Sequence, residues 1–212
     1  MERTSVEEAS KIFGKNFIGP SALKTFFESI GKSLESLNVP EINFTKEVLE
    51  RLADKYILFL GVKSTDEAWE VNIKNLKSIF GSNSLISEPC FYNQDWYESQ
   101  NFISETVENK WYLIKKDVFV ESRSKLPENI LIESNNVQFP SAVICTYIFF
   151  IWYLVRKEIL WKYDFVWCSD KDFNGDRIYV GKYKDIGGLN KNGFSIHRHL
   201  SLRTCYGAID CI

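Results

Sequence analysis

The stretch DKDFNGD, residues 170–176, carries side chains that could bind a metal ion. Four of them have the types and spacing of the first half of an EF-hand loop, in which oxygen ligands surround calcium: Asp170, Asp172, Asn174 and Gly175. Such a loop also needs a bidentate glutamate at its twelfth position, and Gly181 stands there instead. The pattern therefore lacks a ligand that calcium requires.

The residues on either side of this stretch favour a β-hairpin. Phe165–Cys168 and Arg177–Val180 are both apolar and strand-like. Asn174-Gly175 between them is a strong hairpin signal, because both residue types tolerate a positive φ. We expect a turn carrying solvated carboxylates, with calcium held by additional ligands elsewhere in the chain as the alternative.

Both histidines of the chain lie in SIHRHL, residues 195–200. On a strand, His197 and His199 point to the same side, roughly 7 Å apart, a spacing at which two imidazoles can chelate one metal ion. A third ligand would have to be Cys205, an aspartate of the hairpin such as Asp170 or Asp172, or a distant glutamate, and the spacing specifies none of them. The favoured interpretation is that the histidines line a pocket or bond to the core, and a metal site is the alternative.

Nucleophilic catalysis has weak support in the sequence. Cys168, Ser169 and Cys205 could act as nucleophiles with one of the histidines as base. However, the chain contains no G-x-S-x-G, no phosphate-binding loop and no dinucleotide-binding fingerprint. The sequence implies no cofactor and favours a protein that is not an enzyme.

Helical periodicity dominates the first 160 residues. A capping box at Ser5–Glu8 predicts a helix ending at Gly14, and a second at Ser64–Glu67 predicts one ending at Gly81. Further helices are expected over Pro20–Leu37, Thr45–Lys55 and Asn93–Ile103, and strands over Tyr56–Val62 and Trp111–Lys116.

The most apolar segment is Pro140–Val155. Its 16 residues are followed directly by Arg156, Lys157 and Glu158. Crossing a bilayer needs roughly 20 apolar residues. We therefore expect a central core helix that is apolar on all sides, with a membrane span as the alternative.

After Trp161 the pattern changes to short apolar runs separated by Gly and Asn turns. We expect strands at Phe165–Cys168, Arg177–Tyr183, Phe194–Leu200 and Cys205–Asp210. The predicted fold is a single α+β domain over residues 1–212. Its helix-rich part covers residues 1–160, with a long buried central helix, and an antiparallel β-rich part covers residues 161–212.

The composition bounds the partners and the compartment. A net charge of −2 gives no general attraction to nucleic acid or to an anionic membrane, so neither is expected as a partner. The polar N-terminus lacks the apolar run of a secretory signal, and the five cysteines are odd in number with no C-x-x-C pair. We expect a cytoplasmic protein with reduced, mostly buried thiols.

Roughly the last 100 residues resemble a group of uncharacterised bacterial proteins. The resemblance lies in WYLIKKDVFVESRSK (Trp111–Lys125), the Pro-Ser-Ala opening of the apolar helix, VWCSDKDFNGDRIYVGKYKDIGGLN (Val166–Asn190) and YGAID (Tyr206–Asp210). The closing region is also similar to C-type-lectin-like domains, which include variable receptor-like proteins diversified by retroelements. That resemblance implies a binding scaffold with its recognition residues in the irregular segment Gly188–Arg203. The lectin calcium tripeptides Glu-Pro-Asn and Gln-Pro-Asp are absent.

The favoured hypothesis is a non-enzymatic recognition module for a protein or peptide ligand. Tyr and Asn give adaptable contacts at low entropy cost, and Arg adds charge-assisted hydrogen bonds. The side chains expected to face the ligand are Tyr179, Tyr183, Asn190, Asn192, His197, His199 and Arg203. The alternative is a metal-dependent enzyme that uses His197 and His199 with a hairpin aspartate. The oligomeric state does not follow from the sequence.

Overall fold

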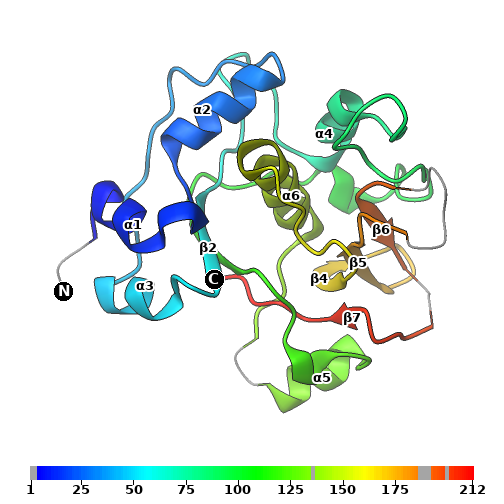
Figure 1. Ribbon diagram of the computed structural model, residues 1–212. Coiled ribbons are helices and arrows are strands. Elements are labelled where there is room, and N and C mark those ends of the chain that lie inside the picture. Colours follow the sequence, from blue (N-terminus) through cyan, green and yellow to red (C-terminus); the bar gives the residue numbers. More distant parts are fainter. Residues whose placement is uncertain (1–3, 135–136, 186–191, 199–200) are drawn as a thin grey trace.

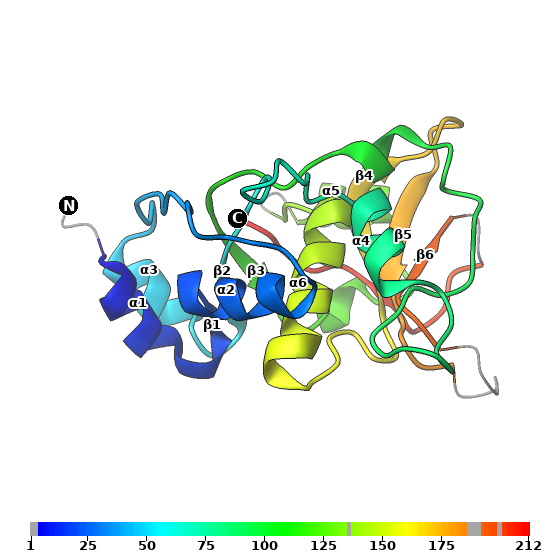
Figure 2. The same ribbon diagram turned by 90° about the horizontal axis from the view of Figure 1, so that it is seen from above.

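The computed structural model describes residues 4–134, 137–185, 192–198 and 201–212. It has an α+β fold in which the central helix α6, Ala142–Arg156, lies between two mixed β-sheets (Figure 1, Figure 2). The expected fold class is therefore confirmed. The main hydrophobic core extends from Ala9 to Cys211 and contains residues of both the helix-rich and the β-rich parts.

The first sheet has the strand order β1-β2-β3. Strand β2, Tyr56–Leu60, pairs in parallel with β1, Phe17–Ile18, and antiparallel with β3, Trp111–Lys115. Every residue of β2 is buried, as expected for a short continuous apolar run. Helices α1 (Val6–Phe13), α2 (Pro20–Ser29) and α3 (Lys46–Leu52) lie on this side of the molecule, and the 3-10 turn Gly14–Asn16 leads into β1 (Figure 1).

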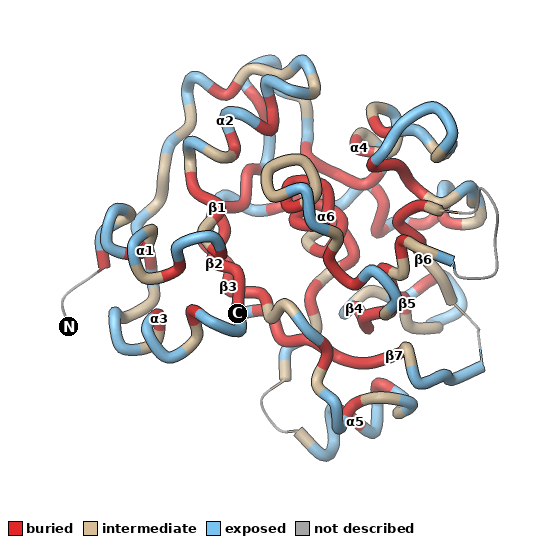
Figure 3. The backbone as a smooth tube through the Cα atoms, viewed as in Figure 1, coloured by how far each residue is buried: buried red, intermediate tan, exposed pale blue. Residues whose placement is uncertain are grey.

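Helix α6 forms because a serine cap precedes a run of residues that pack on all sides. The Ser141 hydroxyl accepts a hydrogen bond from the backbone N–H of Ile144, and the helix ends at Lys157, which has a left-handed conformation. Figure 3 shows the helix buried along most of its length. Within the described ranges, no helix is both long enough and apolar enough to cross a membrane. The prediction of a core helix is confirmed.

The second sheet has the strand order β6-β5-β4-β7. Its strands are β4 (Phe165–Lys171), β5 (Arg177–Gly181), β6 (Ser195–His197) and β7 (Tyr206–Gly207). β5 pairs antiparallel with both neighbours, but β7 pairs in parallel with β4. The expectation of a purely antiparallel sheet is therefore wrong.

The parallel direction of β7 leads the C-terminal segment from the second sheet to the first. After β7 the chain continues to β3 in the first sheet, where Cys211 bridges to Ile114. The backbone N–H groups of Leu113 and Ile212 each donate to the carbonyl of the other residue, at 2.9 Å in both directions. The C-terminal segment thus joins the two sheets (Figure 1).

Three helix predictions need correction. The Ser64–Glu67 box does not start a helix, because the Glu67 carboxylate instead accepts hydrogen bonds from Thr65 and from the backbone of Ser33. Helix α4, Ile73–Phe80, begins after the Asn72 cap. The second helix ends at Ser29 rather than near Leu37, since Gly31 follows with φ +70°. The segment Asn93–Ile103 contains only the 3-10 turn Asn101–Ser104.

The remaining elements cover the outer side of the second sheet. The 3-10 turn Val120–Ser122 and helix α5, Pro127–Glu133, lie beside β7 (Figure 1). Alternate strand residues point to opposite faces of a sheet. Val166, Ile178, Val180 and Ile196 pack into the main core. The other face carries a separate aromatic cluster that includes Phe165, Trp167, Tyr179 and Tyr206.

Candidate functional site

The opening stretch DKDFNGD forms the β4–β5 hairpin turn. The Gly175 N–H donates to the carbonyl of Asp172 at 3.0 Å, and the Asp172 N–H donates to the carbonyl of Asp176 at 2.9 Å. Gly175 has φ +88°, and Asn174 is not among the residues with positive φ. The turn is therefore a three-residue loop that needs one left-handed residue, which glycine supplies.

The Asp172 carboxylate holds this turn together and is not a free metal ligand. Its Oδ1 accepts hydrogen bonds from the N–H groups of Asn174 and Asp176, both at 2.9 Å, and its Oδ2 pairs with Arg198. Burial alone would raise the pKa of Asp172, but the bonds from Arg198, Asp176 and Asn174 outweigh it and lower the pKa. The expectation that this carboxylate is solvated is wrong, because its side chain is 0% exposed.

Asp170 also has a structural partner. Its Oδ2 accepts from the N–H of Ala142 at 2.6 Å, at the start of α6. A carboxylate at this position satisfies an N–H that has no partner within the helix, and its charge complements the helix dipole. Burial raises the pKa of Asp170 to about 6.

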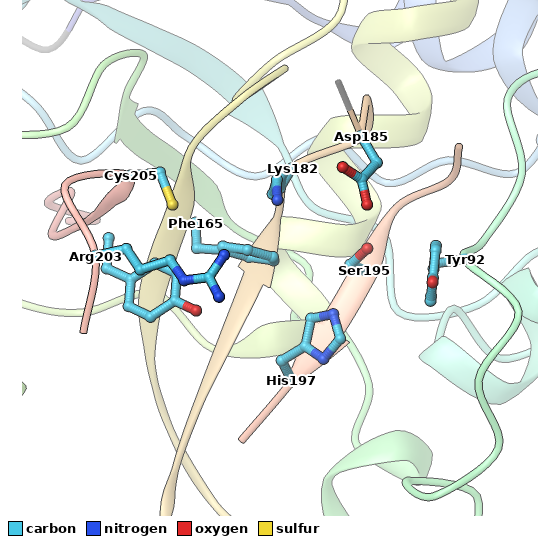
Figure 4. Close-up of a pocket in the computed structure, with 9 residues that line it drawn as sticks. Tyr92, Phe165, Lys182, Asp185, Ser195, His197, Arg203 and Cys205 are labelled. Carbon is cyan, nitrogen blue, oxygen red and sulfur yellow. The ribbon is translucent and has the colours of Figure 1, made fainter. Parts of the chain in front are cut away.

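A cavity of about 180 Å³ opens on the outer face of the second sheet (Figure 4). Aromatic, cationic, acidic and hydroxyl or thiol side chains line it: Tyr92, Phe165, Lys182, Asp185, Ser195, His197, Arg203, Cys205 and Tyr206. In Figure 4, Arg203 and His197 approach the cavity from different sides, with the Phe165 ring between them. The cavity thus joins residues from β4, β6 and β7 with loop residues far away in the sequence.

His197 lies opposite Tyr179 in the β5–β6 ladder, and the two rings stack with centroids 6.0 Å apart. Phe165 presents its edge at 5.4 Å, and the Gln94 amide nitrogen lies 2.9 Å from Nδ1. Burial, assisted by the charge of Lys182, lowers the pKa of His197 to about 4. The imidazole is therefore neutral at physiological pH.

Backbone geometry brings Lys182 to the cavity. Gly181 ends β5 with φ +122°, where an added Cβ would lie 2.6 Å from the carbonyl oxygen of Asp164. Lys182 follows with φ +44°, an uncommon value for a non-glycine residue. Its N–H donates to the carbonyls of Trp161 and Asp164, at 3.0 and 2.7 Å, which holds this turn. The ammonium lies 5.8 Å from the centre of the Phe165 ring.

The segment around β7 supplies a second cation and a thiol. Arg203 is exposed at the edge of the cavity, and Cys205 is partly exposed. Burial raises the pKa of Cys205, so the thiol is protonated at neutral pH and is not poised as a nucleophile. All five cysteines are free, as expected, and the other four are buried.

The structure brings together two of the seven residues expected to face a ligand. His197 and Arg203 line the cavity. Tyr179 and Tyr183 are 1% and 0% exposed, so the expectation that they are presented outward is wrong. Both rings pack against other rings: Tyr179 stacks on His197 and lies tilted against Tyr206, and Tyr183 stacks on Phe149 with centroids 5.6 Å apart.

The other expected residues lie away from the cavity or outside the described ranges. Asn192 does not line the cavity, and its carbonyl accepts a weak hydrogen bond from the Cys90 thiol at 3.8 Å. Asn190 and His199 fall outside the described residues. In the described part of the chain, no three His, Cys, Asp or Glu side chains are placed to hold a metal ion.

Sequence reasoning missed several lining residues. Phe165 and Ser195 share a face with His197 by alternation along β4, β5 and β6, which could have been read from the strand patterns. Tyr92 gave no such signal, since it reaches the cavity through a pairing of Phe91 with Phe194, more than 100 residues apart.

A scan against protein-family models, a search of curated proteins and a search of solved structures each found no match to this chain.

Proposed function

We propose that the chain is a non-enzymatic recognition protein that receives one group of a protein or peptide ligand in the cavity between β4, β6 and β7. The observation that carries the proposal is the convergence of Lys182 and Arg203 with the rings of Tyr92, Phe165 and Tyr206 around one opening. Aromatic walls with a few polar groups are the common composition of ligand sites.

The protonation states in the cavity support recognition over catalysis. His197 is neutral, and burial raises the pKa of Cys205. A Cys–His pair set up for nucleophilic attack needs the opposite, a thiol whose pKa is depressed by its neighbours.

The resemblance to C-type-lectin-like domains adds support from the sequence. It implies recognition residues within the segment Gly188–Arg203, and that segment supplies His197 and Arg203 to the cavity. The neutral imidazole and the adjacent rings form a preorganised surface, because the side chains already pack on one another.

A peptide-display selection tests this proposal. Immobilised wild-type chain is offered random hexapeptides with free carboxyl ends, and enriched sequences are tested against Arg203→Glu. Arg203 is exposed, so the substitution leaves the core intact. We expect enriched peptides to bind the wild type and to lose at least tenfold in affinity for the variant.

The matched control is Arg51→Glu, which makes the same charge change on an exposed residue of α3, on the opposite side of the molecule (Figure 1, Figure 2). Binding to this variant should equal binding to the wild type. A selection that enriches nothing, or peptides that bind all three proteins equally, would refute the proposal.

A further inference from the structure

We propose that the group received in the cavity is a carboxylate on a short apolar stem, which Lys182 and Arg203 bind while the aromatic rings enclose the stem. This inference rests on the proposed function and names the chemistry of its ligand. The same chemistry is offered by the last residue of a peptide and by a free small carboxylic acid.

The charge of the cavity selects a monoanion. Among the lining residues that the structure describes, Lys182 and Arg203 contribute two positive charges, Asp185 contributes one negative charge, and His197 is neutral, which leaves an excess of one positive charge. Neither Lys182 nor Arg203 forms an ion pair within the described residues. A single carboxylate matches this excess, and it can accept both donors because it has two oxygens.

The aromatic lining of the cavity favours a ligand that has apolar carbon atoms next to its anionic group. Phe165 and Tyr206 are buried in the aromatic cluster, and Tyr92 closes the cavity from the loop between α4 and the 3-10 turn Asn101–Ser104. The rings offer apolar surface beside the two cations, so a ligand needs both an anionic end and carbon atoms next to it. A bare inorganic anion would leave that apolar surface uncovered.

The volume limits the size of the group. About 180 Å³ equals the space of about six water molecules at about 30 Å³ each. Drug-sized ligands occupy cavities of about 300–1,000 Å³. The cavity is therefore suited to one amino-acid-sized group.

Cys205 provides a local readout of occupancy. It lines the cavity and is the one cysteine of the five that is not buried. Its alkylation by iodoacetamide, a small neutral reagent, can be followed by mass spectrometry of the intact chain. A ligand that fills the cavity will slow this reaction.

The experiment compares N-acetyl-leucine with N-acetyl-leucinamide, which differ only in the carboxylate. We expect the acid to protect Cys205 in a saturable manner and the amide to need at least tenfold higher concentration. Lys182→Gln and Arg203→Glu should each weaken protection by the acid at least tenfold, and Arg51→Glu should leave it unchanged. Inorganic phosphate should give no protection at the same concentration.

A second arm separates the two sources of the carboxylate. An acetylated hexapeptide ending in leucine is compared with N-acetyl-leucine, both with free carboxyl ends. Tighter protection by the hexapeptide identifies a peptide terminus as the ligand, and equal protection identifies a small carboxylic acid.

Equal protection by the acid and the amide, protection by phosphate alone, or no protection by any probe would each overturn the inference. The proposed function fails separately, when the selected peptides bind Arg203→Glu as well as they bind the wild type. Selected peptides that need Arg203 but bind equally well as amides would leave the recognition role standing and remove the carboxylate.

Discussion

At the scale of single residues, the imidazole of His197 has the clearest measurable consequence. It is confined by Phe165, Tyr179 and Gln94, and burial lowers its pKa to about 4 from 6.5. Between these two pH values the unfolded chain binds a proton that the folded chain does not bind. Stability from this residue is therefore fully present above pH 6.5 and is lost as the pH falls towards 4.

We predict that His197→Asn removes this dependence of stability on pH, because asparagine does not titrate and can still form a hydrogen bond with the Gln94 amide. The free energy of unfolding of wild type minus that of the variant should fall by about 3 kcal/mol between pH 7 and pH 4. Urea denaturation at several pH values measures it. Asp170, whose raised pKa gives the opposite slope, is common to both proteins and cancels in the difference. A difference that does not change with pH would show that the imidazole is not buried.

At the scale of elements, the β4–β5 hairpin shows what the sequence could and could not predict. Asn174-Gly175 and its apolar flanks indicated the turn correctly, since glycine is needed at the left-handed position. The role of the aspartates did not follow from local sequence. Asp170 bonds to α6, 28 residues earlier, and Asp172 pairs with Arg198, 26 residues later. Such partners depend on tertiary packing, which spacing alone does not reveal.

The same reasoning explains the outcome for the candidate site. Arg203 and His197 were identified by residue type. Residue type does not indicate whether Tyr179 and Tyr183 face the solvent or the core. Which face is buried was ambiguous because α6 covers one face and α5 with its aromatic cluster covers the other. A sheet covered on both faces loses the alternation of apolar and polar residues that would have resolved it.

We predict that Asp172→Ala lowers the free energy of unfolding by about 2–3 kcal/mol, because two turn N–H groups and Arg198 lose a common acceptor. Asn174→Ala is the matched control in the same turn. Its side chain is exposed, so a change within about 0.5 kcal/mol is expected. Thermal or urea unfolding of both variants measures this. Equal effects of the two substitutions would contradict the role assigned to the carboxylate.

At the scale of the whole molecule, α6 connects the two sheets. The Tyr147 hydroxyl donates to the carbonyl of Leu60 in β2 at 3.0 Å, and Phe149 packs on Tyr183 and Phe194 beside the second sheet. The C-terminal segment joins the sheets a second time through Leu113 and Ile212. These contacts predict that both sheets unfold together.

We predict that Phe149→Ala lowers the free energy of unfolding by about 3–5 kcal/mol and that the variant still unfolds in a single transition. Far-ultraviolet circular dichroism reports the helices, and tryptophan fluorescence reports the six tryptophans, which include Trp111 and Trp167 in the two sheets. The two probes should give coincident curves for the wild type and the variant. Two separated transitions would show that the sheets belong to independent folding units.

The most direct test of the central claim is the histidine proton NMR spectrum during titration with N-acetyl-leucine. The His197 signal is identified by its loss in His197→Asn. We predict that it shifts and saturates with the acid, stays in place with N-acetyl-leucinamide, and stays in place with the acid in Arg203→Glu. A His197 signal that does not shift with the acid, or that shifts equally with the acid and the amide, would contradict a carboxylate bound beside His197 and Arg203.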